Sequence, residues 1–304
     1  MSHPEPVARR MYDLVEPVGL VPYVADESDE ALMALGLRNP WDAYFAGRAA
    51  PFGRSVPAQV VHAVFYNFAP GEVARHLPRV WDLTTPEAAL AARERGCVAG
   101  MRRILGELAD DPGVARAGDL LLRAATSAPV EGRALYAALR ALPVPQESVA
   151  RLWHAATLLR EHRGDGHTVA LLVEGVGGTE AHVLHALSVG MPAKEFGRVG
   201  HLPAAQLAAV IDGMRVRGLV GADGWLTAAG RATKERVEAL TDRLAQAPYN
   251  ALGPSELDCL VADLEPISAA IRAALTWQQS AAVPVRRRRP RRHFEHTIAT
   301  RDLR

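Results

Sequence analysis

The pattern of apolar and polar positions along the chain is helical. Apolar residues recur every three or four positions in most segments, as at Leu152, Ala155, Ala156 and Leu159. This spacing is typical of helices that bury one face. No segment shows the sustained alternation of apolar and polar positions, with β-branched side chains, that strands show. The sequence therefore predicts a mainly α protein.

Three prolines mark expected helix starts, because proline suits the first helical position. Pro57, Pro70 and Pro86 precede helically patterned segments at 58–68, 71–81 and 87–109. We expect a helix in each of these segments, the third being long and amphipathic.

From Thr179 onward the pattern predicts a winged helix-turn-helix. Helices are expected at 179–189, 191–201 and 202–220, and Thr227 is placed to cap the next helix. Between them, Asp223 and Gly224 separate two short apolar runs, which is typical of a hairpin turn. The expected fold class is mainly α, with two related helical modules plus a winged helix-turn-helix that carries a short two-stranded wing.

The two related modules are inferred from an internal repeat. Identical residues recur at a spacing of 92 positions, among them these pairs: Tyr44 and Tyr136, Arg48 and Arg140, Ala49 and Ala141, Pro51 and Pro143, His62 and His154, Ala63 and Ala155. Alanine-rich composition is the competing explanation, but it does not account for the Tyr, Arg, Pro and His matches. Related repeats usually pack together, so His62 and His154 are expected to approach a common cleft.

The chain is expected to have five parts. Residues 1–130 form the first helical module, 131–178 the second repeat with a segment rich in His and Arg, and 179–250 the winged helix-turn-helix. Residues 251–281 form a closing helix suited to a core or a homodimer. Residues 282–304 are expected to be a disordered Arg-rich tail, with a run of arginines at 286–292.

The composition is that of an ordinary globular protein. The 304 residues are 49% hydrophobic and 23% charged, and the net charge of +1 gives no global field that would attract nucleic acid or a membrane. Cys97 and Cys259 are far apart and indicate no disulfide framework. The N-terminus has no continuous apolar segment typical of a signal peptide. We therefore expect a cytoplasmic protein with no membrane partner.

The segment from Arg151 to His167 holds the main group of candidate ligand-binding residues. These are His154, Arg160, Glu161, His162, Arg163, Asp165 and His167. Gly164 and Gly166 are expected to break the helix and to fold His167 back toward His162. A cluster of titratable groups at the end of a packed helix is where a ligand site is expected.

Two ligand chemistries are open to this segment. Guanidinium groups bind carboxylate or phosphate bidentately, which favours a small anionic ligand at Arg160 and Arg163. Imidazoles with Glu161 or Asp165 would suit a metal ion, but the H-E-x-x-H spacing of metalloproteases is absent and we assign no metal ligands. The structural alternatives are a core histidine at 154 and a salt-bridged helix end. Neither a catalytic residue nor a cofactor can be assigned.

A second candidate group lies in the first repeat. His62, Tyr66 and Asn67 stand at positions i, i+4 and i+5 of one expected helix, so they could line a pocket together. The alternative is a helix that simply packs through its aromatic side chains.

The expected recognition helix offers few groups that read bases. Gln206, Arg215 and Arg217 are the candidate DNA contacts, and Asp212 opposes them. A groove-reading helix usually presents basic or amide side chains near its N-terminus, where this one presents alanines. This weakens the repressor hypothesis, because a winged helix can also serve as a packing module.

Several strings carry a family resemblance. LYAALRALPVP, WHAATLLREHRGDGH, AYFAGRAAPFG and HAVFYNFAP, together with RGLVGADGWLTAAGRA, resemble the SalK-like helix-turn-helix family of actinobacterial proteins over roughly residues 7–250. The last string, within 203–236, also resembles the wing of MarR-type regulators. The resemblance implies a cytosolic helical protein with a helix-turn-helix element and names no catalytic residues. The arginine tail lies outside it.

Three functions are consistent with these observations. The first is a ligand-responsive DNA-binding transcriptional regulator, acting as a homodimer. The second is an enzyme of small-molecule metabolism that uses His154 or His162 as acid or base and arginines to orient an anionic substrate. The third is a non-catalytic interaction protein whose winged domain only packs. We favour the regulator.

Overall fold

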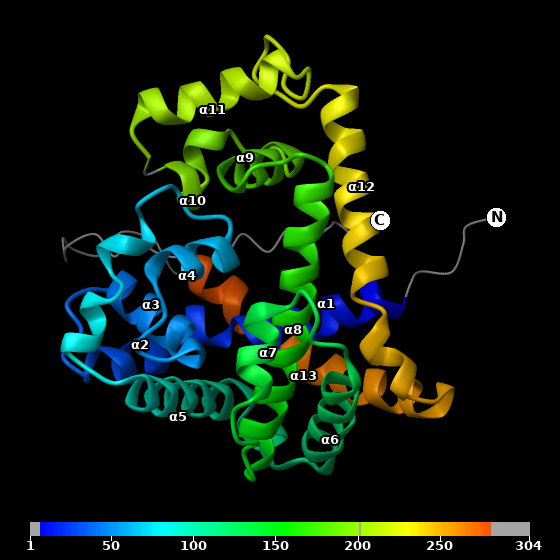
Figure 1. Ribbon diagram of the computed structural model, residues 1–304. Helices are drawn as coiled ribbons and strands as arrows, with labels where there is room; N and C mark the ends of the chain where they lie inside the picture. The colour runs from blue at the N-terminus through cyan, green and yellow to red at the C-terminus, as the bar shows by residue number, and fades with distance from the viewer. Residues whose placement is uncertain (1–6, 201, 281–304) are drawn as a thin grey trace. The chain divides into compact units, whose positions relative to one another are not determined.

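The computed structural model describes residues 7–200 and 202–280 (Figure 1). As predicted, the chain is mainly helical over these residues. The α-helices there are α1 Val7–Leu20, α2 Asp26–Met33, α3 Pro40–Ala49, α4 Ala58–Phe65, α5 Pro86–Leu105, α6 Pro112–Ser127, α7 Ala134–Arg140, α8 Ser148–Val173, α9 Gly178–Ser188, α10 Gly197–Gly200, α11 Ala204–Val216, α12 Ala228–Leu244 and α13 Pro254–Ser280. The arginine run at 286–292, with the rest of the predicted tail at 282–304, lies outside the described residues.

The described chain divides into two compact units. Unit 1 comprises residues 7–64, 70–166 and 242–280, and unit 2 comprises residues 65–69, 167–200 and 202–241. The boundary between the units therefore falls within α8 and again within α12. No helix in the described part of either unit has the length and apolarity needed to cross a membrane.

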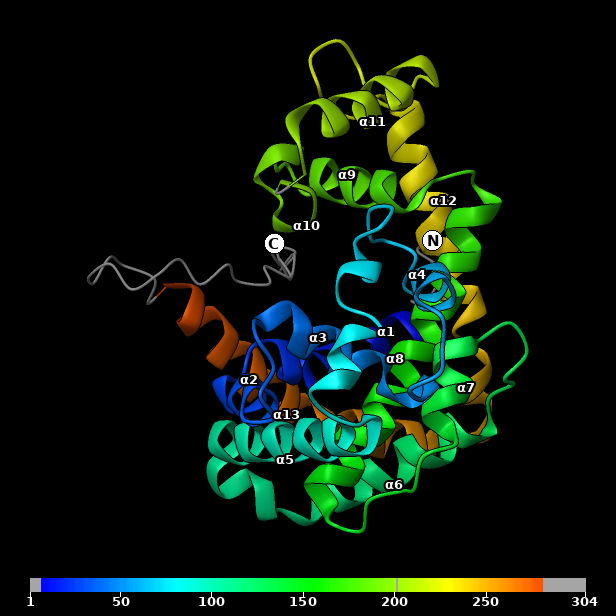
Figure 2. The same cartoon turned by 60° about the vertical axis from the view of Figure 1, so that its left-hand side comes forward.

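In unit 1 the long helix α5 packs against α2 and α3 (Figures 1 and 2). Gly96 and Gly100, one turn apart on α5, make the close approach to α2 possible. A Cβ atom at Gly96 would lie 2.6 Å from the carbonyl oxygen of Glu27, and one at Gly100 would lie 2.6 Å from the Cβ of Ala25. Helix α13 packs against α1 and α6, so the chain's first and last described helices share one core.

Helix α8 is buried on almost every side in unit 1. The predicted apolar positions Leu152, Ala155, Ala156 and Leu159 are all buried, as are Leu158 and several polar neighbours. A helix surrounded by other elements in this way has no solvent face, so its polar residues must find partners inside the protein.

Two helices predicted between 58 and 81 are shorter than expected or absent. Helix α4 ends at Phe65, because Tyr66 adopts a backbone φ of 52°, in the left-handed region. The helix predicted at 71–81 is replaced by two short 3-10 turns, η3 Val73–Arg75 and η4 Arg79–Asp82. Pro78 lies between these turns and cannot donate the hydrogen bond that a continuous helix needs.

Unit 2 has its own hydrophobic core. Helix α9 packs against α10 and α11, and the core between these elements includes Leu184, Phe196, Leu207 and Met214. The predicted cap of α12 is confirmed: the backbone N–H of Gly230 donates to Oγ1 of Thr227 at 3.0 Å. The expected order of three helices followed by a longer one is therefore found, with α10 only four residues long.

The predicted two-stranded wing is wrong, since the described residues contain no β-strand. Val220 and Leu226 form one isolated antiparallel bridge. The extended stretch is short because Gly218, with φ of 71°, terminates α11 and Thr227 already caps α12. Gly221 donates to the carbonyl of Trp225 at 2.8 Å, closing a tight turn between the bridged residues. The segment is thus a loop with a single bridge.

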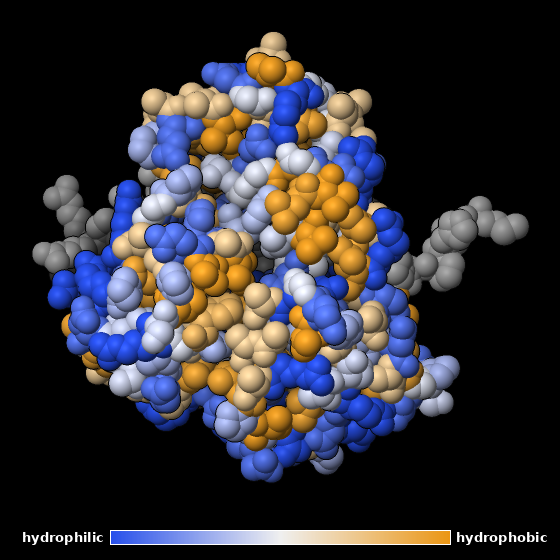
Figure 3. Space-filling view, viewed as in Figure 1, coloured by the Kyte–Doolittle hydropathy of each residue, from blue (hydrophilic) through white to orange (hydrophobic). Residues whose placement is uncertain are grey.

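Unit 2 also exposes apolar side chains on the last turns of α8. Val169, Leu172 and Val173 are exposed at positions i, i+3 and i+4, with Leu172 and Val173 showing 61% and 68% of their surface. Figure 3 shows a hydrophobic area over this end of α8. A stripe at this spacing on a helix is a candidate contact surface.

Candidate functional site

Helix α8 continues without a break through the site predicted at its end. Gly164 and Gly166 do not end the helix, which runs on to Val173, so this prediction is wrong. Tertiary packing overrides the low helix propensity of glycine here, and Gly166 has a packing role, because a Cβ atom there would lie 2.5 Å from Nη1 of Arg133. Consequently His167 is not folded back toward His162. It continues along α8 in unit 2, where its Nδ1 lies 2.9 Å from Oγ1 of Thr241.

Arg160 and Glu161 belong to a buried network of ion pairs in unit 1. Arg48 on α3 donates to Glu161 at 2.9 Å, and Arg160 donates to the other oxygen of the same carboxylate at 2.8 Å. Arg160 also pairs with Glu16 on α1 at 3.1 Å. Arg48 donates in addition to the hydroxyl of Tyr44 at 2.7 Å. The network therefore joins three helices that are far apart in the sequence: α3 and α8 through the carboxylate of Glu161, and α1 and α8 through Arg160.

Aromatic rings enclose these guanidinium groups. The guanidinium carbon of Arg160 lies 5.7 Å from the ring centre of Tyr23 in the 3-10 turn η1 Val21–Tyr23, and the ring of Tyr44 lies 5.7 Å from that of Tyr23. Arg93 on α5 joins the same group, with its guanidinium carbon 6.0 Å from the ring centre of Tyr23 and 5.2 Å from that of Trp153. Cations over aromatic faces are stabilised electrostatically when they are shielded from water. We call Arg48, Arg93, Arg160, Glu16 and Glu161 the arginine cluster.

The arginine cluster contains more positive than negative groups. Three guanidinium groups face two carboxylates, and Arg93 makes no ion pair with any described residue although only 5% of it is exposed. Burial would raise the pKa of Glu161, but the charges of Arg48, Arg160 and Arg93 outweigh that effect and lower it. Burial does raise the pKa of Glu16, against the opposing effect of Arg160. The cluster therefore carries a surplus of positive charge inside unit 1.

Two glycines provide the space that these arginines occupy. A Cβ atom at Gly19 on α1 would lie 2.5 Å from Cδ of Arg160. One at Gly47 on α3 would lie 3.2 Å from Cδ of Arg93. The long aliphatic part of each arginine thus packs against a helix backbone at a glycine, where there is no side chain in the way.

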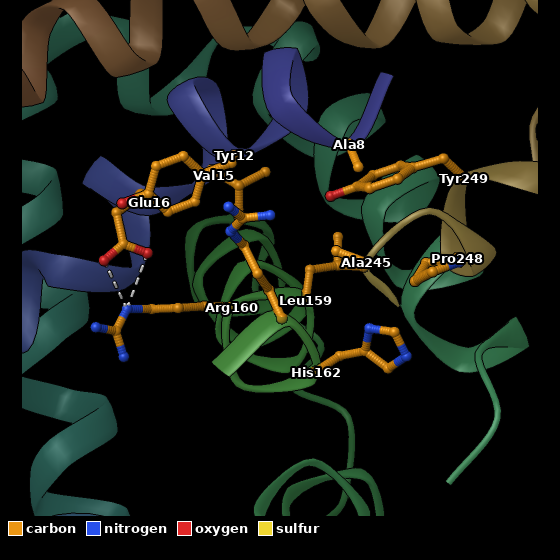
Figure 4. Close-up of a pocket in the computed structure, with 11 residues that line it drawn as sticks. Ala8, Tyr12, Val15, Glu16, Leu159, Arg160, His162, Ala245, Pro248 and Tyr249 are labelled. Carbon is orange, nitrogen blue, oxygen red and sulfur yellow. Dashed lines mark hydrogen bonds and ion pairs between the residues drawn. The ribbon is translucent and has the colours of Figure 1, made fainter. Parts of the chain in front are cut away.

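Arg163 takes part in a second ion-pair group, next to a small pocket. Its guanidinium pairs with Asp242 at 2.7 Å, and Asp242 also accepts from Arg9 at 3.0 Å. The guanidinium carbon of Arg163 lies 4.4 Å from the ring centre of Tyr12. The pocket beside it is lined by residues of α1 and α8 and by Ala245, Pro248 and Tyr249 (Figure 4).

The small pocket is too small for an organic ligand in this conformation. Its volume is about 10 Å³, which is about enough for one water molecule. Figure 4 shows Glu16 and Arg160 joined to each other at one side of the pocket and His162 at another. The charged groups that line the pocket are thus all engaged in ion pairs, Glu16 with Arg160 and Arg163 with Asp242.

The two buried histidines of α8 are weak bases. Burial lowers the pKa of His154, and burial together with the charge of Arg133 lowers the pKa of His162 to about 3. Nε2 of each has no hydrogen-bond partner among the described residues. Both imidazoles are therefore neutral near pH 7, and His162 is a poor general base there. Among the described residues no three His, Cys, Asp or Glu side chains come together as a metal site.

Asp165 and Arg133 hold α7 against α8. The carboxylate of Asp165 accepts from the backbone N–H of Tyr136 at 3.0 Å, at the start of α7. Burial raises the pKa of Asp165 to about 6. Arg133 donates to the carbonyl oxygens of His162 and, at 2.7 Å, of Leu244. These contacts are architectural: Asp165 makes no ion pair with the arginine cluster among the described residues, although the charges of Glu161 and Arg48 act on it.

His62, Tyr66 and Asn67 do not share a helix. His62 is half-buried on α4 in unit 1, whereas Tyr66 and Asn67 follow that helix and belong to unit 2. The hydroxyl of Tyr66 donates to the carbonyl of Val176 at 2.6 Å. Tyr66 is thus bound to its own unit's core, and the shared cleft of His62 and His154 stays a prediction.

Arg93, Tyr23, Trp153 and Glu16 were not among the predicted site residues. One signal for Arg93 is present in the sequence, because Ala89, Gly96 and Cys97 stand one turn away on the same face of α5 and are all buried. An arginine in the middle of an apolar helix face indicates a buried charge. Tyr23 and Glu16 give no such signal, since they meet the cluster only through the fold.

The predicted DNA contacts are Gln206 and Arg215 on α11 and Arg217 directly after it. The exposed face of α11 is mainly apolar. Its exposed residues include Ala204, Ala205, Ala208, Ala209, Asp212, Gly213, Arg215 and Val216. Gln206 is half-buried, and Arg215 pairs with Asp212 at 2.7 Å. Arg217 pairs with Glu180 at 2.7 Å. The exposed surface of α11 is therefore dominated by small apolar side chains.

Comparison with protein-family models matches residues 8–278 to a family described as a helix-turn-helix family. Comparisons with curated proteins and with solved structures gave no match. The family match bears on the helix-turn-helix family as a whole and does not address the SalK-like or MarR-type resemblance. It spans most of the chain and includes residues of both units. The chain therefore belongs to this helix-turn-helix family.

Proposed function

We propose that this helix-turn-helix protein is a ligand-responsive DNA-binding regulator, in which unit 1 binds a small anion and unit 2 contacts duplex DNA. The observation that carries the proposal is the surplus of positive charge in the arginine cluster. A buried charge without a counter-ion is unfavourable. An anion that enters the cluster would remove this imbalance, so its binding would stabilise unit 1.

Helix α11 is the element of unit 2 that we assign to the DNA. It is exposed along one side for its whole length, as a groove-reading helix must be. Its exposed alanines can approach the floor of the major groove and contact thymine methyl groups. Arg215 and Arg217, at its C-terminal end, are exposed enough to reach phosphates. This chemistry favours A·T-rich sites over a pattern of specific base hydrogen bonds.

The electrostatic contribution to DNA binding is expected to be small. Residues 167–241 contain seven basic and seven acidic side chains, so unit 2 has no net formal charge. If two or three phosphates are contacted, the logarithm of the binding constant should fall with the logarithm of salt concentration with a slope of about −2 to −3. A steeper slope would indicate a different binding surface.

The test is fluorescence anisotropy of labelled A·T-rich and G·C-rich duplexes, measured over a range of salt concentrations with and without benzoate or phosphate. We expect preference for the A·T-rich duplex, a shallow salt slope, and a changed affinity when one anion is present. Ala208→Glu, on the exposed face of α11, should abolish binding, whereas Ala91→Glu, exposed on α5, should not. Equal binding by Ala208→Glu, or no response to either anion, contradicts the proposal.

We expect the regulator to act as a homodimer. The exposed stripe of Val169, Leu172 and Val173 is the surface we assign to the pairing of two copies. Sedimentation equilibrium should give a dimer for the natural chain and a monomer for Leu172→Glu. A dimer that persists in this variant would exclude the stripe.

A further inference from the structure

Arg93 is the least paired cation of the arginine cluster. It is 5% exposed, and its guanidinium makes one long hydrogen bond, of 3.4 Å, to the hydroxyl of Tyr23. Its flat faces are covered by the rings of Tyr23 and Trp153. A guanidinium carries five N–H donors at its edge. Most of these donors have no acceptor among the described residues, and the residue as a whole keeps only a small part of its surface in contact with solvent.

Two further buried donors stand on the adjacent face of α8. Nε1 of Trp153 and Oγ1 of Thr157 have no hydrogen-bond partner among the described residues, and the two residues are 6% and 4% exposed. They are one turn apart, and Glu161 follows one turn later on the same face. Arg93 contacts the ring of Trp153 and its charge acts on Glu161. Thr157 therefore lies within the span of α8 that Arg93 faces.

We propose that Arg93, Trp153 and Thr157 form a binding site for a small monocarboxylate. This inference rests on the proposed function, since it assigns the ligand class to the anion site of unit 1. The three side chains offer N–H and O–H donors, and an unpaired buried donor is costly. A carboxylate supplies the acceptor oxygens and the single negative charge by which the cluster is deficient.

The site favours a carboxylate over a phosphate for two reasons. The planar guanidinium edge matches the two oxygens of a carboxylate in a bidentate pair. A phosphate monoester carries up to two negative charges near pH 7 and three acceptor oxygens, which exceeds a surplus of one positive charge. The rings of Tyr23 and Trp153 beside the guanidinium would pack against the apolar part of an organic acid.

The test is isothermal titration of the full chain with benzoate, acetate and inorganic phosphate. We expect one benzoate per chain, weaker acetate binding and no phosphate binding. Arg93→Lys keeps the charge but loses the bidentate geometry, so it should weaken benzoate binding by about tenfold or more. Thr157→Val should weaken it by a smaller factor. Arg95→Lys, which changes an exposed arginine on the same helix, should have no effect.

Melting curves of each variant establish that it is folded before its titration is interpreted. Unchanged benzoate affinity in folded Arg93→Lys and Thr157→Val, absence of carboxylate binding to the natural chain, or tighter binding of phosphate than of benzoate would each overturn the assignment. Duplex binding is measured separately. Carboxylate binding without any effect on duplex affinity would uphold this site and contradict the proposed regulation.

Discussion

Arg163 and Asp242 form a buried ion pair at 2.7 Å that joins α8 to the end of α12 within unit 1. The two side chains are 10% and 12% exposed. Asp242 is shared with Arg9 of α1, and Arg163 also lies over the ring of Tyr12. Three segments that are remote in sequence are therefore fixed by one carboxylate, which makes the pair a sensitive point for the stability of unit 1.

Replacing Arg163 by methionine should destabilise the protein markedly. The change leaves Asp242 buried with only Arg9 as a partner, and breaking a buried ion pair from one side costs about 3 kcal/mol or more. Urea unfolding followed by circular dichroism measures the free energy of unfolding. Arg54→Met is the matched control, because Arg54 and its partner Asp82 are 60% and 74% exposed and lie 3.8 Å apart. An exposed pair contributes less than about 1 kcal/mol. Equal losses in the two variants would contradict the expectation.

Most helices were predicted from the periodic apolar pattern, because a helix that buries one face carries apolar residues every three or four positions. The capping role of Thr227 was predicted correctly from local chemistry as well. One contact is shared by the two predicted repeats. Arg48 donates a hydrogen bond to the hydroxyl of Tyr44, and the matching Arg140 donates one to the hydroxyl of Tyr136 at 3.4 Å. The duplication itself stays a prediction, since one shared contact at i and i+4 can arise independently.

The failures have a common physical origin in tertiary packing. Gly164 and Gly166 are poor helix formers, yet they remain helical because α8 is surrounded by other elements. Arg160 and Glu161 were predicted either to bind an anion or to form a salt-bridged helix end, and their partners Arg48 and Glu16 come from α3 and α1. A contact between such distant residues cannot be inferred from spacing along one helix.

Asp165→Asn should stabilise the protein at neutral pH. The pKa of Asp165 is raised by burial from 3.8 to about 6. A raised pKa means that the contribution of this group to stability is fully present below pH 3.8 and is lost as the pH rises through 6. Asparagine keeps an acceptor for the N–H of Tyr136 without the charge. We expect a gain of about 1–3 kcal/mol at pH 7.5 and little gain near pH 4, measured by urea unfolding. A gain that does not vary with pH would contradict this explanation.

His162→Gln should reduce the sensitivity of the protein to acid. Burial and the charge of Arg133 lower the pKa of His162 from 6.5 to about 3. A lowered pKa means that stability is fully present above pH 6.5 and is lost as the pH falls toward 3. Urea unfolding at several pH values between these limits should show a shallower decline for the variant. A parallel decline in the natural chain and His162→Gln would rule out His162 as the source.

Gly178→Ala should destabilise unit 2 selectively. A Cβ atom at Gly178 would lie closer than 3.0 Å to the carbonyl oxygen of Tyr66. The new Cβ atom is bonded directly to the backbone and the oxygen is part of it, so this clash cannot be relieved by a change of side-chain rotamer. The segment that carries Tyr66 is held to unit 2 by the hydrogen bond from the Tyr66 hydroxyl to the carbonyl of Val176.

Gly213→Ala provides the opposite control within the same unit, because Gly213 lies in α11 and a Cβ atom there would have no neighbour within 4 Å. That change should stabilise the helix by about 0.5–1 kcal/mol. Hydrogen exchange resolved by mass spectrometry distinguishes the units: Gly178→Ala should speed exchange in α9 and α11 and leave α5 and α6 unchanged. Uniformly faster exchange in both units would show that the contact supports the whole chain.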